Sequence, residues 1–189
     1  MSFLNEYMMY PVIEKFLKEE LKCNQTKTNV PFPDGIGRSI DIVGLVRQDD
    51  TPSELIAVEA KCRMSLKEIR DVIMQAEDDK QVAHSVYIAF PENEMYGNPE
   101  KVDKIKRDCE ERGIGLLSVS EKSCETIVLF PKKPSLPDPE KLRKILSNYF
   151  KYEISEFSGF LVKDFCRSSL YYSDPSESSI VEKKLECLV

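Results

Sequence analysis

The order of secondary-structure signals along the 189-residue chain predicts an α/β fold, a mixed β-sheet flanked by helices. Three observations favour it. Apolar residues recur at helical spacing near the N-terminus, two strand-like runs then follow each other directly, and helical and strand patterns alternate from there to about residue 130. Helical patterns beyond a proline-rich stretch add a C-terminal helical appendage.

The first expected helix covers residues 6–22. Its apolar positions share one face at helical spacing: Tyr10, Ile13, Phe16, Leu17 and Leu21. Pro11 either kinks this helix or begins its main part as a first-turn proline. Glu14 places a carboxylate along the edge of the apolar stripe.

Two strands are expected next, after a polar break and the turn signals of "VPFPDGIG". The first, 38–46, alternates so that Ser39, Asp41 and Val43 share a face. The second covers 55–63, and the polar residues 47–54 read as a longish hairpin loop between them.

Capping, turn and strand-forming residues predict the later helices and strands. A capping box, Ser65 with Glu68, predicts a helix whose buried face runs to Ala83. A strand is expected at 85–91, a helix between Asn98 and Gly113, and strands at 114–120 and 125–131.

The chain divides by composition into three parts. Residues 1–130 form the expected α/β domain, 131–139 a linker with four prolines, and 140–189 a helical C-terminal extension. The aromatic residues of that extension suit core or dimer contacts better than base stacking: Phe157, Phe160 and Phe165.

Composition excludes several classes of protein. The net charge of −6 argues against strong nonspecific nucleic-acid binding, although a local basic strip remains compatible with it. Six cysteines without a C-x-x-C pair, and one histidine, leave little for an ordinary zinc site. The chain shows no membrane-length apolar run and no signal peptide, so we expect a cytoplasmic protein with reduced thiols.

One group of residues could carry chemistry. Glu59 and Lys61 lie two apart in a strand and share a face, and Asp41 can join them from the hairpin partner. Two neighbouring carboxylates repel unless a cation lies between them, and Mg²⁺ typically binds one or two carboxylates. Lys61 could then orient an attacking water and stabilise negative charge.

This pattern resembles the PD-(D/E)XK nuclease superfamily, which includes type II restriction enzymes and archaeal Holliday-junction resolvases. Asp41, 17 intervening residues and Glu59-Ala60-Lys61 follow an N-terminal helix, and the resemblance covers about residues 5 to 120. It implies a restriction-endonuclease-like fold. The proline of the family motif is replaced by Ile40.

The resemblance also implies roles for individual residues. Asp41 and Glu59 would be the metal ligands together with the carbonyl of Ala60, and Lys61 would be the catalytic lysine. Glu14 matches the helical acid of many members, and Gln75 matches a glutamine of several branches. The implied cofactor is Mg²⁺, for which Mn²⁺ could substitute.

Glu-x-Lys alone is a weak signal, because it occurs three times in the chain. Only the copy at Glu59 follows an apolar strand and an upstream Asp-bearing strand. The plainer alternative is a solvated strand end with a weak surface ion pair. A basic strip follows, which could track a phosphate backbone or be a solvated helix face: Arg63, Lys67 and Arg70.

The leading functional hypothesis is therefore a metal-dependent DNA endonuclease. The second is a nucleic-acid-binding or assembly module of the same fold with little or no cleavage. A third, an α/β protein acting on small phosphorylated molecules, lacks a phosphate-binding glycine motif. Two active sites for two strands would suit a homodimer. The sequence does not identify the DNA structure recognised.

Overall fold

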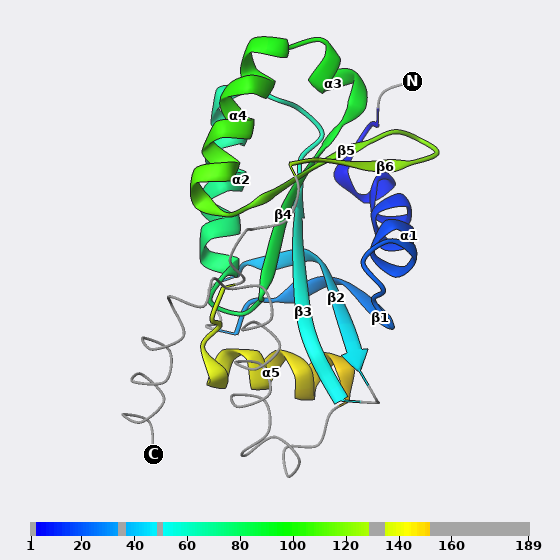
Figure 1. Ribbon diagram of the computed structural model, residues 1–189, viewed down its shortest axis with the longest axis vertical. Helices are drawn as coiled ribbons and strands as arrows, with labels where there is room; N and C mark the ends of the chain where they lie inside the picture. Colours follow the sequence, from blue (N-terminus) through cyan, green and yellow to red (C-terminus); the bar gives the residue numbers. More distant parts are fainter. Residues whose placement is uncertain (1–2, 34–36, 49–50, 129–134, 152–189) are drawn as a thin grey trace, which may run out of the picture. The chain divides into compact units, whose positions relative to one another are not determined.

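The computed structural model describes residues 3–33, 37–48, 51–128 and 135–151. These residues form one six-stranded sheet whose spatial order follows the chain order (Figure 1). The first three strands and the last pair are antiparallel, whereas β3, β4 and β5 run parallel. This confirms the expected mixed sheet. The strands are β1 (Gln25–Pro31), β2 (Ser39–Gln48), β3 (Thr51–Ala60), β4 (Ser85–Pro91), β5 (Gly115–Val119) and β6 (Cys124–Val128).

Helix α1 (Tyr10–Glu19) covers one face of the sheet and follows a 3₁₀ turn, η1 (Glu6–Met8). Pro11 lies in the first turn of α1, so it begins the helix and does not kink it. The apolar stripe of α1, with Ile13 and Leu17 fully buried, packs on Ile42, Val58 and other inward residues of the strands.

Helices α2 (Leu66–Asp79) and α4 (Pro99–Arg112) lie on the opposite face from α1 (Figure 1). The capping box of Ser65 and Glu68 is present, as predicted. α2 ends earlier than expected, because the N–H groups of Val82 and Ala83 both turn back to the carbonyl of Asp79. Gly113 ends α4 in the left-handed conformation, with φ of 63°.

Three expectations about the first strands were wrong. β1 was read as a polar break, because its exposed, polar side chains show no alternation; its strand state comes from pairing with β2. β2 and β3 also pair as far as Gln48 and Thr51, so residues 47–54 are mostly ladder with a bulge after Val46. β3 ends at Ala60 and not at Arg63. The short helix α3 (Glu92–Tyr96) was not expected either.

Helix α5 (Pro139–Phe150) is capped by Asp138 and contacts β1, with Ile145 and Phe150 buried. Just before it, the backbone of Ser135 donates a hydrogen bond to the carbonyl of His84. Residues 131–134 of the expected linker and 152–189 of the expected extension, with its three phenylalanines, lie outside the described residues. None of the helices in the described ranges is both long and apolar enough to cross a membrane.

Candidate active site

The motif residues lie where β2 and β3 separate. β2 stays paired with β1 as far as Ser39, and β3 stays paired with β4 as far as Ala60. The β2–β3 ladder, however, ends at the pair Ile42 and Val58. Asp41 and Glu59 are the next residues along the two strands, so both carboxylates come from the opening in the sheet.

Asp41 fills part of that opening and is 9% exposed. Its Oδ2 accepts the backbone N–H of Ala60 at 2.8 Å, which replaces a missing ladder bond between the strands. Its Oδ1 accepts the hydroxyl of Tyr10 at 2.7 Å, so α1 holds the carboxylate from the other side. Burial and this hydrogen bond raise the pKa of Tyr10. Asp41 thus has a structural role whether or not it binds a metal.

Glu59 is almost completely buried, with 1% of its surface exposed. Its nearest described cation is Arg38, whose Nη2 lies 3.8 Å from Oε1 of Glu59. Burial raises the pKa of Glu59, and the negative charges of Asp79 and Asp41 raise it further, while Lys61 opposes them. The environment of Glu59 therefore favours its protonated form.

The partly exposed Arg38 pairs with the buried Asp79 beside Glu59. Arg38 donates to Asp79, to Asp78 at 2.9 Å and to the carbonyl of Gln75 at 2.6 Å, and its guanidinium also lies over the ring of Phe32. Burial raises the pKa of the fully buried Asp79, and Arg38 partly offsets this effect. Arg38 therefore connects the start of β2 to the last turn of α2.

The two buried carboxyls each keep one oxygen without a described hydrogen-bond donor: Oε1 of Glu59 and Oδ2 of Asp79. A single proton held between the carboxyls would satisfy both atoms, since a protonated carboxyl becomes a donor. Neither Arg38 nor Asp79 was singled out from the sequence. Asp79 could have been, because it continues the buried helical stripe of Val72 and Ala76.

Lys61 follows the end of β3, and its ammonium is directed to the 3₁₀ turn η1. Its backbone N–H donates to the carbonyl of Ala89, and its Nζ lies 3.6 Å from Oε1 of Glu6 in η1. Burial raises the pKa of Glu6; Lys61 lowers it, and the charge of Asp41 raises it. Glu6 is therefore an acid of this site that sequence reasoning missed, although it lies one helical turn before Tyr10.

Of the other predicted site residues, only Gln75 is tied to this group by the described contacts. Glu14 accepts the hydroxyl of Thr26 at 2.7 Å, which directs its carboxylate to β1. Gln75 contributes its carbonyl to Arg38, and its side-chain Oε1 is buried without a described donor. Arg63 and Lys67 are exposed on the loop after β3 and the first turn of α2.

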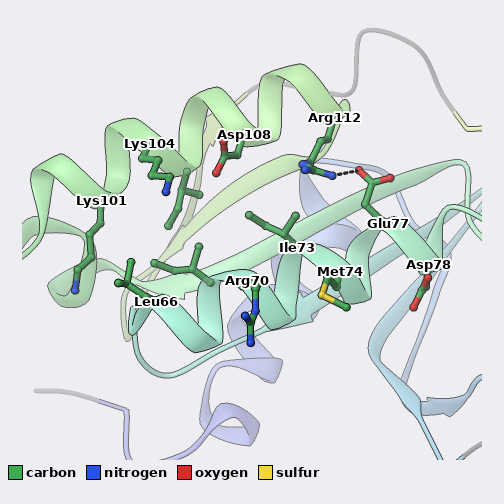
Figure 2. A pocket seen from close by; sticks show the side chains of 12 residues that line it. Leu66, Arg70, Ile73, Met74, Glu77, Asp78, Lys101, Lys104, Asp108 and Arg112 are labelled. Atoms are coloured by element: carbon green, nitrogen blue, oxygen red, sulfur yellow. Dashed lines mark ion pairs between the residues drawn. The ribbon is translucent and has the colours of Figure 1, made fainter.

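Arg70 belongs to a groove of about 690 Å³ between α2 and α4 (Figure 2). Lys101 and Lys104 of α4 line the same end of the groove, while Glu77 at the far end is paired with Arg112 at 3.7 Å. Lys101 also donates to the carbonyl of Met64, so the groove adjoins the loop that follows Lys61.

The donor set can be tested against a divalent ion. In the described ranges, no three carboxylate, thiol or imidazole groups lie close enough together to hold a metal. Two carboxylates with a backbone carbonyl and waters suffice for Mg²⁺, and this matches Asp41, Glu59 and Ala60. No described group donates a hydrogen bond to Oε1 of Glu59, and each oxygen of Asp41 has a second lone pair to offer. These residue types suit a two-carboxylate ion site, which stays a prediction.

Comparisons with known proteins add little to this geometry. No family model matches the chain, and no curated protein matches it. Among solved structures, SfsA of Pyrococcus furiosus, solved in complex with Ca²⁺, aligns with a TM-score of 0.36 and 14% identity. The alignment covers 65% of this chain and 62% of SfsA, less than two thirds of that protein's length. At this level the likeness carries no argument about the site.

Proposed function

We propose that this chain is a metal-dependent DNA endonuclease that hydrolyses phosphodiester bonds. The observation that supports it is the pair of buried carboxylates, Asp41 and Glu59, at the point where β2 and β3 separate, with Lys61 directly after them. Buried carboxylates at a break in a sheet are costly to keep, and such perturbed groups concentrate at functional sites.

Each residue has a distinct task in this proposal. Asp41, Glu59 and the carbonyl of Ala60 would hold the ion, and Mg²⁺, when bound, would supply Lewis-acid stabilisation of a phosphoryl oxygen. Lys61 orients the attacking water and stabilises the negative charge that develops on the phosphate. The phosphate would take the place of Glu6 beside the ammonium, since the two are alternative anionic partners.

A nicking assay on plasmid and branched DNA with Mg²⁺ or Mn²⁺ tests the proposal. We expect Asp41→Asn, Glu59→Gln and Lys61→Ala each to lose at least about 100-fold in rate, the usual scale for removing one electrostatic stabiliser. Lys122→Ala, at an exposed position between β5 and β6, is the matched control and should cleave normally. Cleavage that all three site variants retain would exclude the assignment.

The second candidate is a nucleic-acid-binding module of the same fold with little or no cleavage. Two observations favour it: both oxygens of Asp41 already accept hydrogen bonds, and the environment of Glu59 raises its pKa, which disfavours the ionised ligand. Calorimetric titration distinguishes the two. DNA binding without metal uptake and without nicking would select the module.

A further inference from the structure

An exposed apolar patch lies beside the candidate active site. Three of the four large apolar residues from Leu4 to Met9 are exposed: Leu4 at 86%, Tyr7 at 63% and Met8 at 49%. Exposed apolar residues that cluster, unlike scattered ones, mark places where a ligand or partner binds. The aromatic ring of Tyr7 in this patch favours ligands that can pack against a ring.

The patch is joined to the site through Tyr10 and through Glu6. The ring of Tyr7 meets the ring of Tyr10 edge-on, with centroids 5.2 Å apart, and Tyr10 donates to Asp41 at 2.7 Å. The residue before Tyr7 is Glu6, which is paired with Lys61. One ring contact and one hydrogen bond therefore connect Tyr7 to the carboxylate of Asp41, and Tyr7 itself belongs to the 3₁₀ turn η1.

We infer that Tyr7 is a stacking platform for an unpaired nucleobase next to the phosphate bound at Lys61. This inference rests on the proposed function and names its substrate class: nucleic acid with unpaired nucleotides, such as a single strand, an overhang or a flap. Bases stack on exposed aromatic rings without sequence preference, whereas the faces of paired bases in a duplex are already covered by their neighbours.

The charges around the site support an apolar contribution to binding. The ammonium of Lys61 is already paired with Glu6 at 3.6 Å, and the charge of Asp41 acts on the same Glu6 carboxyl, so phosphate alone is weakly attracted there without a cation. Stacking does not depend on counterion release, whereas phosphate contacts weaken steeply as salt rises. The contribution of Tyr7 to affinity should therefore persist at high salt.

The test measures binding by fluorescence anisotropy, without divalent ions, to a labelled 12-nucleotide single strand and to the matching duplex. We expect Tyr7→Ala to weaken single-strand binding about 5- to 150-fold, at low and high salt alike, with duplex binding unchanged. Tyr7→Phe should bind as the parent does. Tyr96→Ala, which removes a 79% exposed tyrosine from α3, is the matched control and should have no effect.

Equal effects of Tyr7→Ala and Tyr96→Ala, or equal effects on single strand and duplex, would overturn the inference. So would a parent protein that self-associates in sedimentation and becomes monomeric in Tyr7→Ala without a change in DNA binding. Lys61-dependent nicking that Tyr7→Ala leaves intact on every substrate refutes this inference alone. Tyr7-dependent binding of single strands without any nicking refutes the endonuclease alone.

Discussion

Replacing Arg38 by Met should destabilise the protein strongly, because Arg38 is paired with the buried Asp79 and lies close to the buried Glu59. The guanidinium donates to Asp79, which is fully buried, and lies 3.8 Å from Glu59, which is 1% exposed. Met keeps much of the apolar volume of the side chain and removes only its charge and donors. The variant therefore isolates the electrostatic contribution of Arg38.

The magnitude follows from these contacts. Removing one partner of a buried ion pair costs about 3–5 kcal/mol, and the lost bond to the carbonyl of Gln75 adds about 1 kcal/mol. Protonation of the carboxyls limits the total, so we expect a loss of about 3–5 kcal/mol at pH 8 and a smaller loss at pH 5. Since small domains are stable by about 5–15 kcal/mol, this is a large fraction.

Urea denaturation measures the effect in five proteins, with midpoints compared at unchanged slope: the parent, Arg38→Met, Asp79→Asn, the double variant and Asp78→Asn. The double variant Arg38→Met with Asp79→Asn lacks the buried acid, so its free energy of unfolding should exceed that of Arg38→Met by at least about 2 kcal/mol. Asp78→Asn is the matched control, because the Asp78 side chain is 58% exposed and its pair should be worth below about 1 kcal/mol. Equal losses from Arg38→Met and Asp78→Asn, or strict additivity in the double variant, would refute the reasoning.

Three further predictions concern the same region and the core. Tyr10→Phe removes a buried donor from the Asp41 carboxylate and should cost about 1.5–3 kcal/mol in urea unfolding; a loss below about 0.5 kcal/mol would show that the bond is unimportant. Gly115→Ala should cost about 1–3 kcal/mol of stability by overpacking and so lower the thermal midpoint, because its Cβ would clash with the Tyr87 ring; an unchanged midpoint would contradict this packing. Burial raises the pKa of Asp79 in the folded protein from 3.8 to about 7, so Asp79 binds a proton more tightly in the folded than in the unfolded state. The contribution of Asp79 to stability therefore falls as pH rises from about 4 to 7, by up to about 1.4 kcal/mol per pH unit. The unfolding free energy of Asp79→Asn minus that of the parent should therefore grow with pH over this range. The subtraction removes the opposite effect of His84, whose pKa is lowered to about 3 by burial. A difference independent of pH would contradict the raised pKa of Asp79.

Elements with a complete local signal could be predicted from the sequence. The capping box at Ser65 and the helix end at Gly113 were predicted, and the first-turn position of Pro11 was one of two alternatives; each depends on chemistry within four residues. β4 was located at its observed bounds, because an uninterrupted apolar run is typical of a strand buried on both faces. β1 could not be found in this way, since its polar residues become a strand only by pairing with β2.

The residues of the candidate site also divide into those with a local sequence signal and those that only folding brings together. Asp41, Glu59 and Lys61 are close in sequence and were found by strand spacing and by resemblance. Glu6, Arg38 and Asp79 approach the site from η1, the start of β2 and the end of α2, which only the folded chain brings together. Asp79 continues the apolar stripe of α2, but it is also the third acid of a Glu-Asp-Asp run, a composition typical of a solvated helix end.

Binding of Mn²⁺ to the unmodified protein and to two site variants is the most direct measurement of whether Asp41 and Glu59 together hold a divalent cation. By isothermal titration, we expect one ion per chain in the parent. Its affinity should fall by at least about 100-fold in folded Asp41→Asn and Glu59→Gln, because outer-sphere partners alone are worth about 10–100-fold. An ion bound equally well by the parent and both variants, or no ion bound by the parent, would contradict the account.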